Sequence, residues 1–158
     1  MTRQLLYTLG AEAAGAPGTR ASGVAAVRDL LTARGLDTSS LVLQNGAGLS
    51  RDERASMQLF VDLLRKAYAS PYAPEFLASL SLGGLDGTPR GRFDAAPSQG
   101  VMHLKTGRLD HVSAVAGYVH AAGGRTYVVA AVMNHENAHR GPGEELEEAV
   151  LRYAQSLR

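Results

Sequence analysis

One stretch decides the fold of this chain: Gly100-Val101-Met102-His103-Leu104-Lys105-Thr106-Gly107. It predicts a short strand that ends in a Lys-Thr-Gly triplet. Two more strands are predicted after it, over residues 112–120 and 126–133, and the turn residues 122–125, Ala-Gly-Gly-Arg, join them. Connections this short indicate antiparallel pairing.

The triplet itself predicts a binding site. A strand that ends in Lys-Thr-Gly can present an ammonium, a hydroxyl and an unobstructed backbone edge in one row. Such a row suits a substrate with a carboxylate end, which would pair with Lys105 and Thr106 while its backbone lies along the strand. The alternative is an ordinary strand end without a ligand, because the same tripeptide also arises by chance.

Apolar residues at helical spacing predict helices before and after the three strands in the sequence. The expected helices lie near residues 5–9, over 21–35, over 57–67 and over 74–80, and a closing helix over 144–157 has Leu146, Val150, Leu151 and Ala154 inward. Helices, then three antiparallel strands, then a helix predict an α+β fold in which the last helix packs on the sheet. Further strands of so small a sheet would have to come from outside this chain.

The chain is predicted to form one partial domain over residues 1–158. Within it, residues 1–99 are a mainly helical segment with loops, 100–134 form the sheet and 143–158 form the C-terminal helix. A chain of 158 residues can bury one ordinary core. Residues 83–100, broken by Gly and Pro, are expected to be a long connection of the kind that is often functional.

Composition excludes several classes of function without naming one. The formal net charge of +1 and the absence of Lys or Arg runs argue against a nucleic-acid partner. No apolar stretch is long enough for a membrane span, and the first residues do not resemble a signal peptide. The chain contains no cysteine, which excludes disulfides and thiol nucleophiles. No cofactor is implied.

A glycine-rich loop precedes the third helix. It reads Asn45-Gly46-Ala47-Gly48-Leu49-Ser50-Arg51, and Ser50 with Glu53 has the spacing of a capping box. Ser56 is the rival cap. The loop lacks the third glycine and the Lys-Ser or Lys-Thr pair of a phosphate loop, so no phosphate site is predicted.

Residues 135–139 read His-Glu-Asn-Ala-His, a literal H-E-x-x-H. In a zinc peptidase both histidines face one side of a helix, with the glutamate beside the metal-bound water. Here the segment directly follows a strand, and Gly141-Pro142-Gly143 would break a helix just after His139. A solvated loop is therefore preferred, and no metal site is predicted. No G-x-S-x-G elbow is present either.

Three motifs in this order carry a resemblance to a known family: residues 45–51, the Leu85-Asp86-Gly87-Thr88 loop, and Leu104-Lys105-Thr106-Gly107. The chain resembles the D-alanyl-D-alanine carboxypeptidase/endopeptidases among the class C low-molecular-mass penicillin-binding proteins. The likeness spans nearly all 158 residues and includes the glycine-containing strand 114–119 and the closing helix. It implies the C-terminal portion of a penicillin-binding, β-lactamase-like transpeptidase domain.

The resemblance also implies a mechanism. In the family a serine of a Ser-x-x-Lys motif attacks cell-wall peptides that end in D-Ala-D-Ala, Ser-x-Asn assists proton transfer, and Lys-Thr-Gly binds the terminal carboxylate. By resemblance, Lys105 and Thr106 bind the carboxylate and Gly107 keeps the strand edge free of a side chain. The backbone N–H of Arg108 would complete an oxyanion hole.

Two family motifs are missing from this chain. Its only lysines are Lys66 and Lys105, neither of which is preceded by serine at the required spacing, and no Ser-x-Asn occurs. Asn45 and Ala47 stand where the family usually has Asp and Ser. The chain is thus expected to be the C-terminal part of a longer periplasmic or extracytoplasmic enzyme, with no catalytic nucleophile of its own.

The partners implied by the resemblance are peptidoglycan stem peptides and β-lactams in the full-length protein. The isolated chain is expected to be inactive and to self-associate, because apolar surface would lack its cover. Two alternatives remain open: a stand-alone, non-catalytic module that binds peptidoglycan peptides or a partner chain, and an H-E-x-x-H zinc peptidase.

Overall fold

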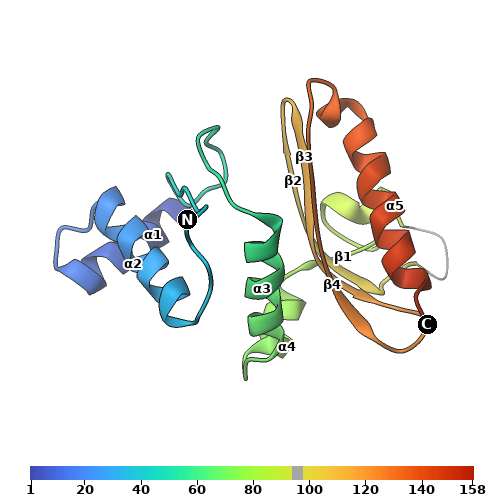
Figure 1. Cartoon of the computed structure of the whole chain (residues 1–158), viewed down its shortest axis with the longest axis horizontal. Helices are drawn as coiled ribbons and strands as arrows, with labels where there is room; N and C mark the ends of the chain where they lie inside the picture. Colours follow the sequence, from blue (N-terminus) through green and yellow to red (C-terminus); the bar gives the residue numbers. More distant parts are fainter. Residues whose placement is uncertain (94–97) are drawn as a thin grey trace. The chain divides into compact units, whose positions relative to one another are not determined.

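A computed structural model of the chain describes residues 1–93 and 98–158 (Figure 1). Its elements are α1 (Thr2–Ala14), α2 (Arg20–Ala33), α3 (Met57–Tyr68), α4 (Ala73–Ala78), β1 (Ser81–Leu82), the 3₁₀ helix η1 (Thr88–Gly91), β2 (Met102–Leu109), β3 (Val112–His120), β4 (Thr126–Asn134), the 3₁₀ helix η2 (Ala138–Arg140) and α5 (Pro142–Ser156). The α+β prediction is confirmed. Residues 94–97 of the long connection predicted over 83–100 lie outside the described residues.

The described residues fall into two compact units, Met1–Leu59 and Phe60–Arg158. In the first unit α1 and α2 cross at close range, because a Cβ on Gly10 or Gly23 would overlap the other helix. Thr19 caps α2 by accepting a hydrogen bond from the backbone N–H of Ser22. That one domain covers the whole chain stays a prediction.

The second unit is built on a four-stranded antiparallel sheet in the order β1-β2-β3-β4. The three long strands are those expected from sequence. The fourth, β1, pairs Ser81 with Leu104 and Leu82 with His103. Two residues are too few for an alternating pattern, which is why the sequence did not indicate this strand.

Helix α5 covers one face of the sheet and encloses the core (Figure 1). The residues of this core are Phe93, Met102, Leu104, Val115, Val119, Val129, Leu151 and Ala154. The helix approaches β3 closely at Gly143, where a Cβ would lie 2.3 Å from the Cβ of Ser113. The buried stripe of α5 therefore runs through Gly143, Glu147, Leu151 and Ala154. The expectation that Leu146 points inward is wrong, since it is exposed.

A buried polar cluster fixes the long connection to α5. Glu147, 2% exposed, accepts hydrogen bonds from Ser113 Oγ at 2.6 Å and from Arg92 Nη1 at 2.8 Å. Arg92 also donates to Glu148 at 3.2 Å and to the backbone carbonyl of Glu144 at 3.0 Å. A charge this deeply buried is tolerated because it is paired and hydrogen-bonded.

The other face of the sheet is met by α3, from Phe60 on, and by α4 (Figure 1). Tyr118 lies fully buried on this face and donates a hydrogen bond of 2.7 Å to the carbonyl oxygen of Leu64. Its ring contacts Tyr68 and Phe76, with centroids 5.4 and 6.4 Å away. Burial, with a smaller effect from Tyr68, raises the pKa of Tyr118 to about 12.

A pair of histidines connects β2, β3 and α4. The rings of His103 and His120 lie edge to face with centroids 5.5 Å apart. His103 Nδ1–H donates to the carbonyl of Leu77 at 3.1 Å, because a carbonyl can only accept, and His120 Nδ1 lies 2.9 Å from Thr126 Oγ1. Burial, and then the neighbouring His103, lower the pKa of His120 below its usual 6.5.

Several helix boundaries differ from the sequence expectation. Helix α1 runs from Thr2 to Ala14, beyond residues 5–9 near which it was expected. Helix α3 begins at Met57, and Ser56 Oγ accepts a hydrogen bond from the N–H of Leu59 in its first turn at 3.1 Å. Ser50 Oγ accepts one from the N–H of Asp52 at 3.2 Å, outside any helix. Val42 and Arg54 of the first unit form an isolated antiparallel bridge. None of the helices in the described part of the chain has the length and apolar character needed to cross a bilayer.

The buried cluster leads to a test of stability. Glu147→Ala leaves Arg92 and Ser113 without their shared acceptor, so we expect the free energy of unfolding to fall by about 3–5 kcal/mol. The matched variant Glu148→Ala removes a partner of the same arginine that is only partly buried, and should cost at most about 1 kcal/mol. Urea unfolding followed by circular dichroism compares them. Equal losses in the two variants would contradict this account of the cluster.

The lowered pKa of His120 predicts a pH dependence. Because the native state disfavours protonation, the stabilisation from neutral His120 is complete above pH 6.5 and is lost as the pH falls through the native pKa. Thermal melts from about pH 8 to about pH 5 should fall less steeply for His120→Gln than for the natural chain. An NMR titration that placed the His120 pKa at or above 6.5 would contradict the prediction.

Candidate functional site

The Lys-Thr-Gly triplet lies inside β2, which continues past it to Leu109. This differs from the expectation that the strand ends at the triplet. The strand is buried at Met102 and Leu104, where β1 and the core cover it, and Lys105 and Gly107 are exposed. The first half of β2 thus anchors the strand, and its second half carries the predicted binding residues.

Beyond Leu104, one edge of β2 is unpaired among the described residues, because β1 reaches no further. The N–H of His120 donates to the carbonyl of Val101, and the N–H of Gly83 donates to the carbonyl of Met102. Backbone groups of successive residues in a strand point to opposite edges. The N–H and C=O groups of Thr106 and Arg108 therefore point away from β3, into the open edge.

The ammonium of Lys105 also lies at this edge. Its Nζ donates a hydrogen bond to the carbonyl oxygen of Thr106, one of the outward-pointing groups. Among the described residues no carboxylate forms a recorded ion pair with Lys105. A full positive charge therefore stands beside a free strand edge, where it can pair with an incoming carboxylate.

Gly107 has no structural reason to be glycine. Its backbone is not left-handed, and a Cβ built on it would meet only the Cβ of Ala114, at an ordinary 3.8 Å. Gly117 on the neighbouring strand is the opposite case, because a Cβ there would lie 2.0 Å from the carbonyl oxygen of His103. Packing within the described residues therefore does not require a glycine at position 107.

Arg108 is held by its side chain, which forms an ion pair with Glu144 in the first turn of α5. This contact turns the guanidinium toward α5, and the backbone N–H remains at the open edge. Glu144 is the one contact of the site that sequence reasoning missed. Its sign, opposite to that of Arg108, is visible in the sequence, but only the packing of α5 on the sheet brings the two together.

The hydroxyl of Thr106 is half-buried and makes no hydrogen bond among the described residues. Strand alternation directs the side chains of Lys105 and Thr106 to opposite faces of the sheet. The two can act on one ligand only at the strand edge, where both faces meet. The arrangement can therefore hold an extended, anionic chain end. It offers no serine beside Lys105 in the strand to serve as a nucleophile.

The two loops that accompany the triplet in the resemblance are separate features of the structure. Asp86 accepts a hydrogen bond from the N–H of Leu82 at 2.7 Å and so closes the turn after β1. The loop 45–51 belongs to the first unit, where Glu53 accepts weak hydrogen bonds from the N–H groups of Gln44 and Asn45. The expected capping box of Ser50 and Glu53 does not form, because no helix begins there.

The H-E-x-x-H residues do not lie together on one helix. His135 and Glu136 precede the short helix η2, so the two histidines do not share a helix face. Instead His139 Nδ1 accepts a hydrogen bond from the N–H of His111 at 2.9 Å, and His111 Nδ1 lies 2.7 Å from the carbonyl of Glu136. No group of three or more metal-ligating side chains occurs within residues 1–93 and 98–158. These residues fasten the β2–β3 turn to the segment before α5.

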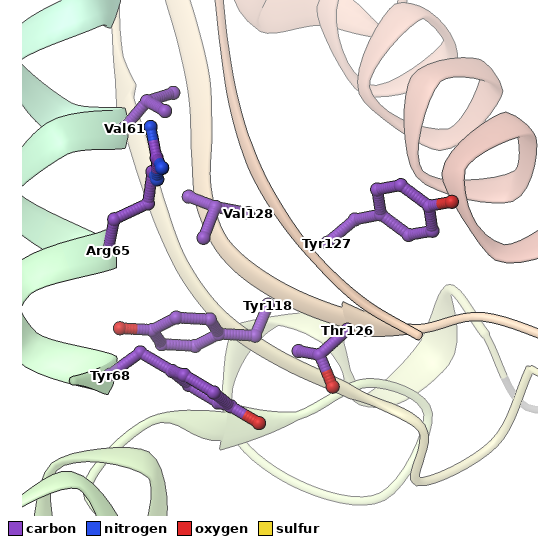
Figure 2. A pocket seen from close by; sticks show the side chains of 7 residues that line it. All are labelled: Val61, Arg65, Tyr68, Tyr118, Thr126, Tyr127 and Val128. Carbon is purple, nitrogen blue, oxygen red and sulfur yellow. The ribbon is translucent and has the colours of Figure 1, made fainter. Parts of the chain in front are cut away.

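Two shallow cavities occur elsewhere in the second unit. One of about 340 Å³ is lined by Val61, Arg65, Tyr68, Tyr118, Thr126, Tyr127 and Val128 (Figure 2). Another, of about 410 Å³, is lined by Val101, His120, Ala121, Ala122, Arg152, Gln155 and Ser156. Neither includes a residue from Lys105 to Arg108. The predicted site is thus described as an open strand edge.

The chain is similar in sequence to known proteins. The sequence profile of the D-Ala-D-Ala carboxypeptidase 3 (S13) family matches residues 1–154. The D-alanyl-D-alanine carboxypeptidase of Actinomadura sp. (strain R39) is 37% identical over 143 residues, which are 87% of this chain and 26% of that protein. Carboxypeptidase DacB of Mycolicibacterium smegmatis is 30% identical over 148 residues, 90% of this chain and 32% of that protein.

The fold has a counterpart among solved structures. Penicillin binding protein 4 (dacB) from Haemophilus influenzae, in complex with a β-lactam, superposes with a TM-score of 0.90 at 21% identity. The match covers 99% of this chain and 38% of that chain. The chain therefore spans only about a quarter to two fifths of the length of these relatives.

Proposed function

The chain belongs to the D-Ala-D-Ala carboxypeptidase 3 (S13) family, and from that premise we propose that it supplies the substrate-binding strand of a serine carboxypeptidase/endopeptidase. The proposed substrates are peptidoglycan peptides that end in D-Ala-D-Ala. The observation that carries the proposal is the edge of β2 that is open among the described residues. Outward backbone groups, a side-chain-free glycine and the ammonium of Lys105, which has no ion-pair partner among those residues, adjoin there.

Each residue of this edge has a proposed role. The ammonium of Lys105 leaves the carbonyl of Thr106 and pairs with the terminal carboxylate of the peptide, to which the Thr106 hydroxyl also donates. The peptide backbone lies along the outward groups of Thr106 and Arg108 as an added strand, and Gly107 leaves space for it. The N–H of Arg108 stabilises the oxyanion that forms at the scissile carbonyl.

The catalytic serine is proposed to lie on polypeptide outside these 158 residues. The chain contains no Ser-x-x-Lys and no Ser-x-Asn, and it covers 26% of the Actinomadura carboxypeptidase. The chain by itself is therefore proposed to be inactive and to resist acylation by penicillin. The longer enzyme would act outside the cytoplasm, where peptidoglycan lies, and the isolated chain would self-associate through surface that the longer protein covers.

A stand-alone binding module is the second candidate. It is favoured by the same edge, which offers an ammonium to a peptide carboxylate and carries no serine nucleophile. The zinc-peptidase alternative is not favoured, because His135 and His139 do not share a helix face. In addition, His139 Nδ1 accepts a hydrogen bond from the backbone N–H of His111.

The proposed carboxylate site is tested with the only two lysines of the chain. A peptide ending in D-Ala-D-Ala should bind weakly and saturably, and Lys105→Ala should weaken binding at least about tenfold by removing a charged hydrogen bond of roughly 1.5–3 kcal/mol. Lys66→Ala, on the exposed surface of α3, is the matched control and should bind normally. Isothermal titration or NMR shift mapping measures both.

Gly107→Val extends this test to the strand edge. The added side chain should block the peptide without unfolding the sheet, because a Cβ there is within ordinary contact distance of Ala114 alone. Equal binding by the natural chain, Lys105→Ala and Gly107→Val would refute the site. The proposed site would also be refuted if Lys66→Ala lost as much affinity for the peptide as Lys105→Ala.

A further inference from the structure

The backbone of Arg108 lacks, among the described residues, the hydrogen bonds that hold its neighbours in the sheet. Arg108 lies opposite Ser113, and the bond from the N–H of His120 to the carbonyl of Val101 sets the alternation along β2. By this alternation Arg108 and Ser113 form a non-hydrogen-bonded pair, whose backbone groups do not bond to each other. The neighbour Gly107 has no side chain with which to anchor the strand. The direction of the Arg108 N–H is therefore sensitive to what holds the Arg108 side chain.

The first turn of α5 holds this side chain. The guanidinium of Arg108 forms an ion pair with the carboxylate of Glu144, and the two side chains are 50% and 35% exposed. Among the described residues no second carboxylate forms a recorded ion pair with Arg108. Glu145, the other acidic residue of the turn, is exposed and has no recorded ion pair within the same residues. One carboxylate therefore determines where the Arg108 side chain lies.

Buried contacts fix Glu144 in turn. Its backbone carbonyl accepts a hydrogen bond from Arg92 Nη2 at 3.0 Å, and Arg92 also pairs with the buried Glu147 at 2.8 Å. Gly143, one residue earlier, approaches β3 so closely that a Cβ would lie 2.3 Å from the Cβ of Ser113. The carboxylate of Glu144 thus stands on a helix end that cannot shift along the sheet without breaking buried contacts.

These contacts close a ring around the end of the β2–β3 hairpin. Ser113 Oγ donates to Glu147 at 2.6 Å, so α5 contacts β3 at the residue opposite Arg108 and contacts β2 through Arg108 itself. The N-terminal end of α5 accordingly lies beside the end of this hairpin (Figure 1). All members of the ring belong to the second unit, so the ring is present in the chain as it stands.

We propose that Glu144 is a positioning residue, which holds the backbone N–H of Arg108 in the direction that receives the carbonyl oxygen of a bound peptide. The inference rests on the proposed function, in which that N–H stabilises the oxyanion. A donor that already points at the place where charge develops does not have to be ordered when the substrate binds. Glu144 itself touches no substrate and acts only through Arg108.

A role of Glu144 in stability alone predicts a different outcome. An ion pair between partly exposed side chains contributes little to folding, because water screens the two charges. Loss of the Glu144 carboxylate should therefore change the order of the Arg108 N–H and the affinity for the peptide, and should leave the thermal midpoint nearly unchanged. This difference separates a positioning role from a structural one.

Glu144→Gln removes the charge and keeps the size of the side chain, and Glu145→Gln is the matched control. Both residues lie in the first turn of α5, so both variants lose the same interaction with the helix dipole. In isothermal titration with a peptide ending in D-Ala-D-Ala, Glu144→Gln should bind about threefold to tenfold more weakly than the natural chain. Glu145→Gln should bind like the natural chain. Glu144→Asp, which keeps the charge, should recover part of the loss.

Two further readouts would not respond to a merely structural role. In Glu144→Gln the NMR order parameter of the Arg108 N–H should fall from about 0.85, the value of a rigid backbone, toward about 0.6. The thermal midpoint by circular dichroism should equal that of Glu145→Gln. In the Arg108→Met background, Glu144→Gln should have no additional effect on the affinity for the peptide, because Glu144 acts through Arg108.

Lys105→Ala separates failure of this inference from failure of the proposed function. If Lys105→Ala loses the peptide while Glu144→Gln binds it like the natural chain, the inference is overturned and the carboxylate site stands. An Arg108 N–H that is equally ordered in Glu144→Gln and Glu145→Gln would also overturn the inference, as would additive losses of affinity in the Arg108→Met background. If the natural chain binds no peptide, the proposed function fails and the inference fails with it.

Discussion

Leu104 of β2 faces Gly117 of β3, and a Cβ at Gly117 would lie 2.0 Å from the carbonyl oxygen of His103. This close approach favours one register between the two strands over its neighbours. A shift by one residue would move Met102 and Leu104 out of the core and would also reverse the edge to which each backbone group points. The backbone groups of Thr106 and Arg108 point to the outer edge only in the observed register. Core packing and the candidate site therefore depend on the same strand pairing.

Helix α5 packs on one face of the paired strands, and its N-terminal half also contacts a residue of the candidate site. Glu147 anchors the helix to β3 and to the long connection through Ser113 and Arg92. One turn earlier, Glu144 holds the side chain of Arg108 against the helix. The backbone of Arg108 is thereby positioned by an element that no peptide ligand needs to touch. Rigid support of this kind is what a site for an extended ligand requires.

Sequence patterns were sufficient for the long elements and for the class of the fold. Strand β3 was predicted with the boundaries that are observed, and the triplet was placed on the correct strand. The missed features all depend on contacts between distant segments. The two residues of β1 become a strand only because β2 lies beside them. Glu147, a charged residue, is buried in place of Leu146 because Ser113 and Arg92 satisfy its carboxylate.

The candidate site was predictable to a similar degree. Lys105, Thr106, Gly107 and Arg108 could be named from the triplet and the family resemblance. That the strand edge beside them is open could not be predicted from the sequence. It depends on where β1 ends and on which backbone groups of β2 bond to β3. The glycines and proline after the H-E-x-x-H pattern indicated that it does not form a long helix, and only the short η2 forms there. The actual role of these residues, fastening the turn at His111, follows only from the folded chain.

The central claim is that this chain provides the carboxylate-binding strand of a longer serine enzyme. One gel tests it most directly: extract of the source cells is labelled with fluorescent penicillin and blotted with an antibody against this chain. The account predicts that both signals coincide on a band well above 16.6 kDa. An antibody band near 16.6 kDa without penicillin label would contradict it, and would show a stand-alone protein whose function lies in binding.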